Sequence, residues 1–155
     1  GTILLSENVS IGSLCQIMCN PGGTISMGTS SILRTRSKLS CAHRIAIGNH
    51  VLIGQNVHIG DQEHEYRDIN VPVMNQGTIA NDDISGIEIG DNSWIGMNVV
   101  IVGNVKIGKN CVVGANSVLR TNLPDYTVAA GSPARIIKQY SHEQGKWIKP
   151  TKLIN

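Results

Sequence analysis

A six-residue period runs through most of this chain and constrains its fold more than any other feature. One phase of the period places an aliphatic residue at its first position eight times, with a gap of five whole periods in the middle: Ile47, Ile53, Ile59, Ile89, Ile95, Ile101, Ile107 and Val113. All but Ile101 are followed directly by glycine, and the residue four places on is small or β-branched except at Glu63. Six is the period of neither an α-helix nor an amphipathic strand, so the pattern is an internal repeat.

Each hexad predicts a short strand followed by a bend. We expect the aliphatic residue to point inward, the glycine to free the backbone at the bend, and the small fifth residue to fill the interior. One hexad buries little apolar surface, so stacked coils must share a core, which predicts an all-β solenoid. Three earlier residues share the phase and three do not: Ile11, Gly12 and Cys15 against Ile25, Ile32 and Leu39. Residues 17–46 are therefore interpreted as imperfect coils of the same domain.

The repeat resembles that of the bacterial hexapeptide-repeat transferases. The resemblance implies a left-handed parallel β-helix, a triangular prism with three hexads per coil. Parallel crossovers are normally right-handed, so the left hand rests on the resemblance alone. We expect the β-helix domain to cover residues 1–138, with a loop extruded at about residues 65–86. Residues 139–155 are expected to form a C-terminal tail with a short helix and a coil, anchored by Trp147.

Length and composition fit this fold and narrow the function. The 155 residues suit one domain. No apolar run approaches the roughly 18–20 residues of a membrane span, and no signal peptide is recognisable. Because the chain does not begin with Met, an upstream segment or tag is expected to be missing. Phe is absent and only two Trp and three Tyr occur, which suits a thin prism packed with Ile and Val.

Four cysteines are predicted to be reduced, structural thiols. Cys15 and Cys111 occupy the small interior position of hexads, and Cys41 lies in the inward phase. Disulfides or a metal site are the alternatives, but buried thiols behave as small apolar residues. Reduced thiols are typical of the cytoplasm, which is the predicted location.

The charges are distributed unevenly along the chain. Residues 8–60 contain no Asp or Glu, although the net charge of the whole chain is only +2. Arg34, Arg36 and Lys38 alternate, which predicts that they share one face of a strand. Two interpretations remain open: a solvated outer face, or an anion site for phosphates or an acidic acceptor.

The repeat is interrupted after Gly60 by polar, irregular sequence that ends near Gly86, beyond which the hexads resume in phase. A solenoid can extrude such a loop without disturbing its stacking, and long loops in compact domains often carry function. His64 lies at the last position of its hexad, where we expect an exposed corner.

An imidazole titrates near neutral pH and suits removal of a proton from a hydroxyl group. One of three neighbouring carboxylates is expected to orient the His64 ring: Asp61, Glu63 or Glu65. An ordinary surface histidine is the alternative.

The sequence Val57-His58-Ile59-Gly60-Asp61-Gln62-Glu63-His64-Glu65-Tyr66 resembles the segment that carries the catalytic histidine in hexapeptide-repeat O-acetyltransferases. The resemblance implies that His64 is the catalytic base and that Asp61 and Tyr66 contact the acceptor. The Asp-x-x-His-x-Tyr form favours a sugar hydroxyl in precursors of capsule, exopolysaccharide or lipopolysaccharide.

The C-terminal part of the chain carries a second resemblance. Trp94, at the last position of its hexad, matches a corner tryptophan that packs beside acceptor and pantetheine in the family; a shielding aromatic is the alternative. The segment Val128-Ala129-Ala130-Gly131-Ser132-Pro133-Ala134-Arg135-Ile136-Ile137-Lys138 resembles the family's closing segment beside acetyl-CoA. The resemblance implies cofactor contacts from four residues: Ala130 and Gly131 to the pantetheine amides, and Arg135 and Lys138 to the CoA phosphates. A solvated basic tail is the alternative for the last two.

One departure concerns the CoA phosphates. Relatives often have a lysine where this chain has Thr121, so either Arg120 substitutes for it or one contact is missing.

These observations predict an acetyl-CoA-dependent O-acetyltransferase that acts as a homotrimer with active sites between subunits. Its acceptor would be a small sugar, with no metal and no nucleic acid involved. The alternatives are an N-acetyltransferase of a nucleotide-linked amino sugar and a non-catalytic β-helix scaffold. A zinc enzyme like the γ-class carbonic anhydrases is disfavoured, because that family's close histidine pair has four residues between its members, whereas His58 and His64 have five.

Overall fold

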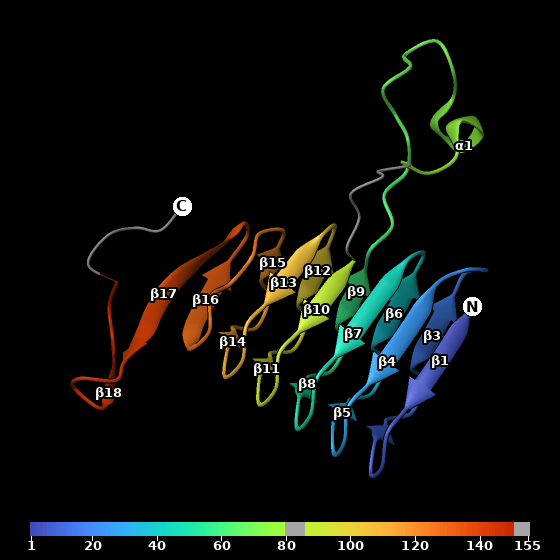
Figure 1. Cartoon of the computed structure of the whole chain (residues 1–155). Helices are drawn as coiled ribbons and strands as arrows, with labels where there is room; N and C mark the ends of the chain where they lie inside the picture. Colours follow the sequence, from blue (N-terminus) through green and yellow to red (C-terminus); the bar gives the residue numbers. More distant parts are fainter. Residues whose placement is uncertain (80–85, 151–155) are drawn as a thin grey trace.

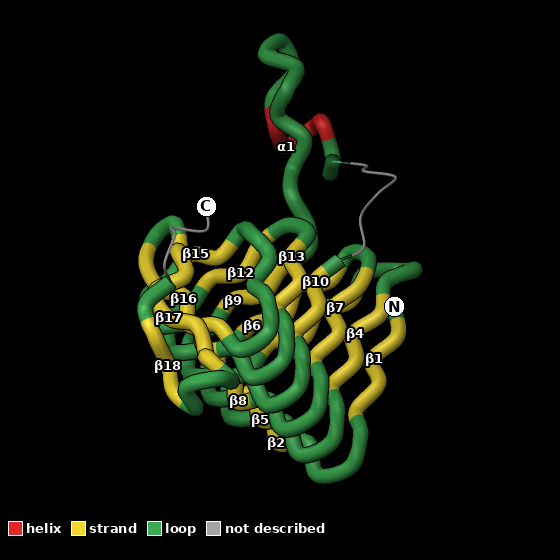
Figure 2. Tube along the Cα trace, turned by 60° about the vertical axis from the view of Figure 1, so that its left-hand side comes forward, coloured by secondary structure: helices red, strands yellow, loops and turns green. Residues whose placement is uncertain are grey.

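The computed structural model describes residues 1–79 and 86–150. The backbone winds into a solenoid in which each full coil adds one short strand to each of three sheets (Figure 1), here named A, B and C in chain order. The coil-to-coil pairings are all parallel, and only the last two strands of sheet B pair antiparallel. Viewed from another side, the three sheets enclose a prism (Figure 2). The predicted three-sided parallel β-solenoid is confirmed.

The strands are short and their bounds follow the repeat. Sheet A contains β1 (Thr2–Leu5), β4 (Thr24–Met27), β7 (Arg44–Ile47), β10 (Ile87–Ile89) and β13 (Val105–Ile107). Sheet B contains β2 (Ser10–Ile11), β5 (Ile32–Leu33), β8 (Leu52–Ile53), β11 (Trp94–Ile95), β14 (Val112–Val113), β16 (Thr127–Gly131), β17 (Ala134–Ser141) and β18 (Lys146–Ile148). Sheet C contains β3 (Gln16–Cys19), β6 (Lys38–Cys41), β9 (His58–Gly60), β12 (Val100–Val102) and β15 (Val118–Leu119). A single helical turn, α1 (Val73–Gln76), lies in the loop that projects from the prism (Figure 1).

The aliphatic position of each hexad forms the core. All eight in-phase residues are at most 3% exposed, and the small fifth residues from Val51 to Ser117 are buried with them. Ile25 and Leu39, which lie off the phase, are equally buried, so residues 17–46 are coils of the same prism. Ile32 instead faces outward while its neighbour Leu33 points inward.

The glycines of the hexads serve the stacking of coils, and the prediction that they free a bend is wrong. Gly48, Gly54 and Gly90 have ordinary backbone angles. A Cβ atom on Gly54 would lie 2.8 Å from the carbonyl carbon of Gly96 in the next coil, and one on Gly90 would lie 2.6 Å from that of Gly108. Only glycine allows this approach of one coil to the next.

The left-handed backbone conformation that turns the chain occurs two residues after each of these glycines. Eleven non-glycine residues have φ between 53° and 61°, and six of them are asparagine, the residue type that tolerates this region best after glycine. All eleven lie at the corners between sheets A and B or between B and C. At the second of these corners Asn56 donates to Asn98, and Asn98 donates to Asn116, both at 2.9 Å.

Every departure from a coil length of three hexads occurs at the third corner, between sheets C and A. In sheet A, Ile3 pairs with Ile25, Ile25 with Ile45, Ile45 with Ile87, and Ile87 with Val105, so only the last interval is three hexads long. The extra residues lie after β3, β6 and β9, always at this corner. The projecting loop leaves from the same edge (Figure 2).

Asp61 holds this corner together. It is 3% exposed, and its carboxylate accepts hydrogen bonds from the backbone N–H groups of Ala42, His43 and Arg44 at 2.6, 2.9 and 2.7 Å. The expectation that Asp61 contacts the acceptor does not fit this placement, because both carboxylate oxygens are engaged inside the corner.

Replacing Asp61 with alanine is expected to lower the free energy of unfolding by about 2–3 kcal/mol, since three backbone donors lose their acceptor. Urea unfolding at fixed protein concentration measures the change. Glu143→Ala, which removes an exposed carboxylate, is the matched control and should change stability little. Equal stability of the two variants would contradict this account of the corner.

The C-terminal segment differs from the expected short helix. Strand β17 passes through residue 138 without a break, pairs antiparallel with β16, and continues into a hairpin with β18. Tyr140 packs edge-on against Trp147 with ring centroids 5.4 Å apart, so Trp147 anchors a strand rather than a helix. The hairpin covers the edge of sheet B that the last coil would otherwise expose.

The four thiols are free. Cys41 and Cys111 are buried, whereas Cys15 and Cys19, which belong to the first coil, are half-buried. Burial, and then the nearby Asp61 carboxylate, raise the pKa of Cys41 to about 12, so this thiol stays protonated. Among the described residues, no helix is long and apolar enough to cross a membrane.

Candidate active site

His64 stands on a short stem where the loop leaves the prism. The stem is antiparallel: the N–H of Glu65 donates to the carbonyl of Gly77 at 3.1 Å, and the N–H of Ile79 donates to the carbonyl of Glu63 at 2.9 Å. His64 lies between them, opposite Thr78, and its side chain is exposed. The stem fixes the backbone of His64 while leaving its imidazole open to a ligand.

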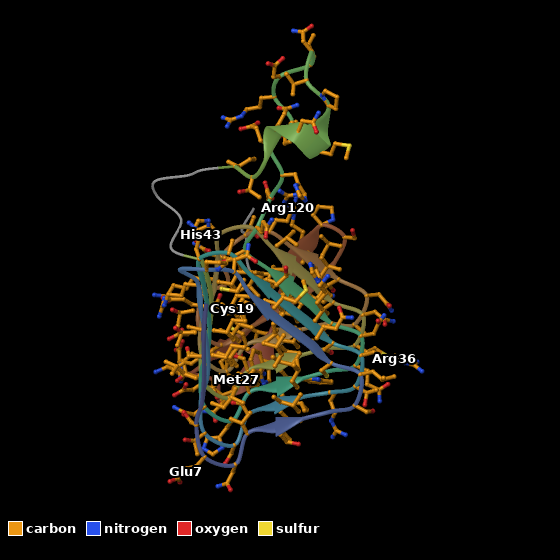
Figure 3. All side chains as sticks on the ribbon, turned by 90° about the vertical axis from the view of Figure 1, so that its right-hand side faces the viewer. Glu7, Cys19, Met27, Arg36, His43 and Arg120 are labelled. Atoms are coloured by element: carbon orange, nitrogen blue, oxygen red, sulfur yellow. The ribbon has the colours of Figure 1, made fainter. Side chains whose placement is uncertain are left out.

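An ion pair ties this stem to a later coil. The guanidinium of Arg120, which follows β15, contacts the carboxylate of Glu63. The two residues line a cavity of about 180 Å³ together with Asp61, Ile79, Val102, Gly103 and Asn104. Figure 3 shows Arg120 at the base of the projecting loop. The sequence suggests Arg120 only as a phosphate contact and does not predict its pairing with Glu63.

The three carboxylates expected to orient His64 are engaged elsewhere. Asp61 bonds to backbone amides, Glu63 pairs with Arg120, and Glu65 pairs with Arg67. The Arg67 side chain lowers the pKa of Glu65 to about 2, so this carboxylate is ionised throughout the physiological range. No carboxylate of the described residues forms a hydrogen bond with His64.

For the acetyl transfer predicted from the sequence, replacing Arg120 with glutamine is expected to lower kcat about five-fold, because the His64 stem loses its link to the later coil. The KM for acetyl-CoA should stay unchanged. The measurement is steady-state kinetics with acetyl-CoA varied, and Glu63→Gln should reproduce the loss without adding to it in the double variant. A rise in KM without a fall in kcat would instead favour the phosphate contact.

Trp94 lies on the outer face of sheet B and not at a corner. The last position of a hexad is the outward residue of a strand, since Trp94 pairs with Leu52 on β8 and with Val112 on β14. Its side chain is 52% exposed and, with Met97, borders an apolar cavity of about 370 Å³ that has Arg34 at its rim. This side of the prism is opposite the corner that carries His64, so one chain does not bring the two residues together.

The closing segment forms a hairpin at the end of the prism. Ala130 pairs with Arg135, and Val128 with Lys138, across β16 and β17. Gly131 has φ of 104°, a conformation that favours glycine. Its N–H already donates to the hydroxyl of Ser117 at 3.0 Å, so a pantetheine contact at this residue would have to use the carbonyl.

Tyr66, which was expected to contact the acceptor, lies in the projecting loop, and its side chain is 64% exposed.

The three basic residues of the first coils do not share a strand face, contrary to expectation. Arg34 follows β5, Arg36 lies in the turn with φ of 61°, and Lys38 begins β6. The three residues therefore lie around the corner between sheets B and C. Arg44 lies elsewhere, on sheet A, where it pairs with Glu88.

Next to Lys38 on the outer face of sheet C lies His58. Partial burial, and then the charge of Lys38, lower the pKa of His58 below its usual 6.5. The unfolded chain therefore binds more protons than the folded chain just below pH 6.5, and the free energy of unfolding should fall as the pH falls through this window. Urea unfolding from about pH 7.5 to 5 measures the slope, which His58→Gln should reduce. Identical slopes would refute the assignment.

Comparison with known proteins supports a common family. The family model for bacterial transferase hexapeptide (six repeats) matches residues 86–121. A putative lipopolysaccharide biosynthesis O-acetyl transferase of Escherichia coli, WbbJ, is 38% identical over 65 residues, which are 42% of this chain and 33% of that protein. A probable acetyltransferase of Mycobacterium tuberculosis is 34% identical over 78 residues, 50% of this chain and 25% of that protein. The chain thus spans only a quarter to a third of these curated relatives.

Among solved structures, a hexapeptide-repeat containing acetyltransferase of Vibrio cholerae, complexed with acetyl coenzyme A, is 31% identical to this chain. The two superpose with a TM-score of 0.77 over 90% of this chain and 71% of the other.

Proposed function

Because this chain belongs to the hexapeptide-repeat acetyltransferases, we propose that it transfers an acetyl group from acetyl-CoA to a sugar hydroxyl, with His64 as the general base. The observation that carries the proposal is the placement of His64: an exposed imidazole on a hydrogen-bonded stem, at the one edge where the repeat opens. The similarity to a structure that holds acetyl-CoA supports the choice of donor.

In the proposed reaction, His64 accepts the proton of the acceptor hydroxyl while the hydroxyl oxygen of the acceptor attacks the thioester carbonyl carbon. The tetrahedral intermediate collapses by breaking the carbon–sulfur bond, and the protonated imidazole returns its proton to the CoA thiolate. No covalent acyl-enzyme is needed, and Cys41 and Cys111, both buried, are poor candidates for one. General-base catalysis supplies about 10²–10⁴-fold, and positioning of the two substrates and a donor to the oxyanion supply the rest.

We propose further that the active site forms between two copies of a homotrimer. His64 and Trp94 lie on opposite sides of one prism, so a site containing both takes them from different chains. The outward residues of sheet B support a second copy at that face, because they form an apolar row of Ile32, Leu52, Trp94, Val112 and Val128.

The donor is proposed to lie along this face and to end at the closing hairpin. Arg135 and Lys138 would pair with the CoA phosphates there, and backbone groups of Ala130 and Gly131 would contact pantetheine. The sugar would approach from the side of Tyr66 and Trp94. The E. coli relative named for lipopolysaccharide biosynthesis favours a glycan precursor as the acceptor.

The experiment that tests the proposal is release of CoA thiol from acetyl-CoA by the wild-type protein, with sugars, nucleotide sugars, nucleotide-linked amino sugars and serine as acceptors. Mass spectrometry of the product locates the acetyl group. Release that depends on a sugar and yields an ester would support O-transfer, and an amide product would instead support N-transfer. A protein that does not bind acetyl-CoA would contradict the proposal and favour a scaffold.

A further inference from the structure

We infer that the outer face of sheet C carries a second binding site, for an oxyanion, formed by Arg36, Lys38, His58, Gln16 and Asn56. These residues line a cavity of about 320 Å³, with Leu14, Ser37 and Val57 completing its wall. The size suits a phosphate group or a hexuronate sugar. The site is separate from the stem of His64 and does not rest on the proposed acetyl transfer.

The strand register aligns the polar groups of this site. Gln16 on β3 pairs with Lys38 on β6, and Lys38 pairs with His58 on β9. All three occupy the outward position of their strands, and neighbouring strands in a sheet lie about 4.8 Å apart. A single small anion therefore falls within reach of the Lys38 ammonium and the imidazole of His58.

The turn at the edge of this face adds a guanidinium. Arg36 occupies the left-handed position that asparagine holds in the following coils of the same corner, Asn56, Asn98 and Asn116. The side-chain ladder of those asparagines ends at Asn56, and the guanidinium of Arg36 forms no hydrogen bond or ion pair with any described residue. Its side chain extends away from the prism (Figure 3). Because an arginine stands here in place of asparagine, the ladder does not extend to this coil. The five N–H donors of the guanidinium are then available to a ligand.

The positive charge of the face is not neutralised within the described chain. Neither Arg36 nor Lys38 has a carboxylate within ion-pair distance there, and residues 8–60 contain no acid. The next coils present Val100 and Val118 at the same outward position. This arrangement differs from Arg44, Arg67, Lys106 and Arg120, each of which meets a glutamate.

His58 suits this site because it brings a donor without a third permanent charge. Burial and Lys38 favour its neutral form, in which one ring nitrogen donates. Lys38 from β6 is the charged group that faces it, since Val100 from β12 is apolar and Gly60 has no side chain. An anion in the cavity would offset Lys38 and return the pKa of His58 toward its usual value.

The test is an NMR titration of the His58 imidazole in the intact protein, without acetyl-CoA, at low ionic strength. Inorganic phosphate and D-glucuronate are the two probes, and the one that binds tells a phosphate ligand from a carboxylate ligand. We expect saturable shifts of the His58 signals, and an affinity that falls about five-fold or more in Arg36→Asn and in Lys38→Gln. Arg36→Asn installs the residue that the corner prefers, so its fold should be unaffected.

Lys149→Gln removes one exposed positive charge outside the site and is the matched control. Wild-type affinity in this control, together with weaker binding in both site variants, would support the inference. Equal binding in all four proteins would overturn it, because the shifts would then report net charge alone. Failure of both probes to shift His58 at millimolar concentration would overturn it as well.

Discussion

Replacing His64 with alanine is expected to lower kcat for acetyl transfer by about 10²–10⁴-fold, the usual contribution of a general base. The side chain is exposed and bonds to no carboxylate of the described residues, so its loss removes little from the fold. The stem that carries it is held by backbone hydrogen bonds that alanine keeps. The KM for acetyl-CoA and the thermal stability should therefore stay near their wild-type values while turnover is lost.

A second histidine at the same corner provides the control. His43 is exposed and contributes its backbone N–H to Asp61, a contact that does not need its imidazole. His43→Ala should keep wild-type kcat, which separates loss of a base from loss of any histidine at this edge. If His64→Ala also kept kcat within two- to three-fold, the base would have to be sought elsewhere, and the proposed mechanism would be wrong.

Replacing Gly90 with alanine is expected to lower the free energy of unfolding by about 3 kcal/mol or more, or to prevent folding. The new Cβ would lie 2.6 Å from both the carbonyl carbon of Gly108 and the backbone nitrogen of Lys109 in the next coil. These are backbone atoms, and the coils cannot separate there without breaking the parallel pairing of β10 with β13. One added methyl group therefore strains the stacking of the whole prism.

Thermal and urea unfolding of Gly90→Ala measure this cost. Ala46→Val is the control, because Ala46 points outward from β7 and the added methyl groups meet the open side of sheet A. A control that unfolds like the wild type, beside a strongly destabilised Gly90 variant, is the expected pair. Similar stability of both variants would mean that the coils can move apart and that glycine is not required.

Much of the fold can be predicted from the hexad phase, because the phase shows which residues are buried in the core. The aliphatic and small positions are buried as predicted, even though nothing in a single hexad identifies its neighbour. The reason for glycine was predicted wrongly, since a one-dimensional pattern does not reveal how closely two coils approach. The tail was predicted wrongly as well: β17 is a strand because β16 offers it an open edge, and that edge exists only once the prism is complete.

The candidate site could be predicted only in part. The interruption of the repeat identifies the edge, and His64 is exposed there as expected. The pairing of Glu63 with Arg120 joins residues 57 positions apart, and only the register of sheet C brings them together. Two signals pointed to it: Glu63 breaks the hexad rule at the fifth position, and Arg120 follows β15 as Asp61 follows β9. The sequence predicts a corner position for Trp94, whereas the last residue of a hexad is the outward residue of a strand.

The corner between sheets C and A has a consequence for how such a protein can diversify. At the other two corners, an inserted residue would break an asparagine ladder or push apart backbones already in contact. The corner between sheets C and A carries three inserts of different length: residues 20–23, residues 42 and 43, and the long loop after Gly60. Selection can lengthen, shorten or replace the segment beside His64 while the core keeps its sequence. Under the proposed function, changes in this segment beyond Asp61 would alter substrate choice, while the stacked coils and the Asp61 contacts would keep the prism stable.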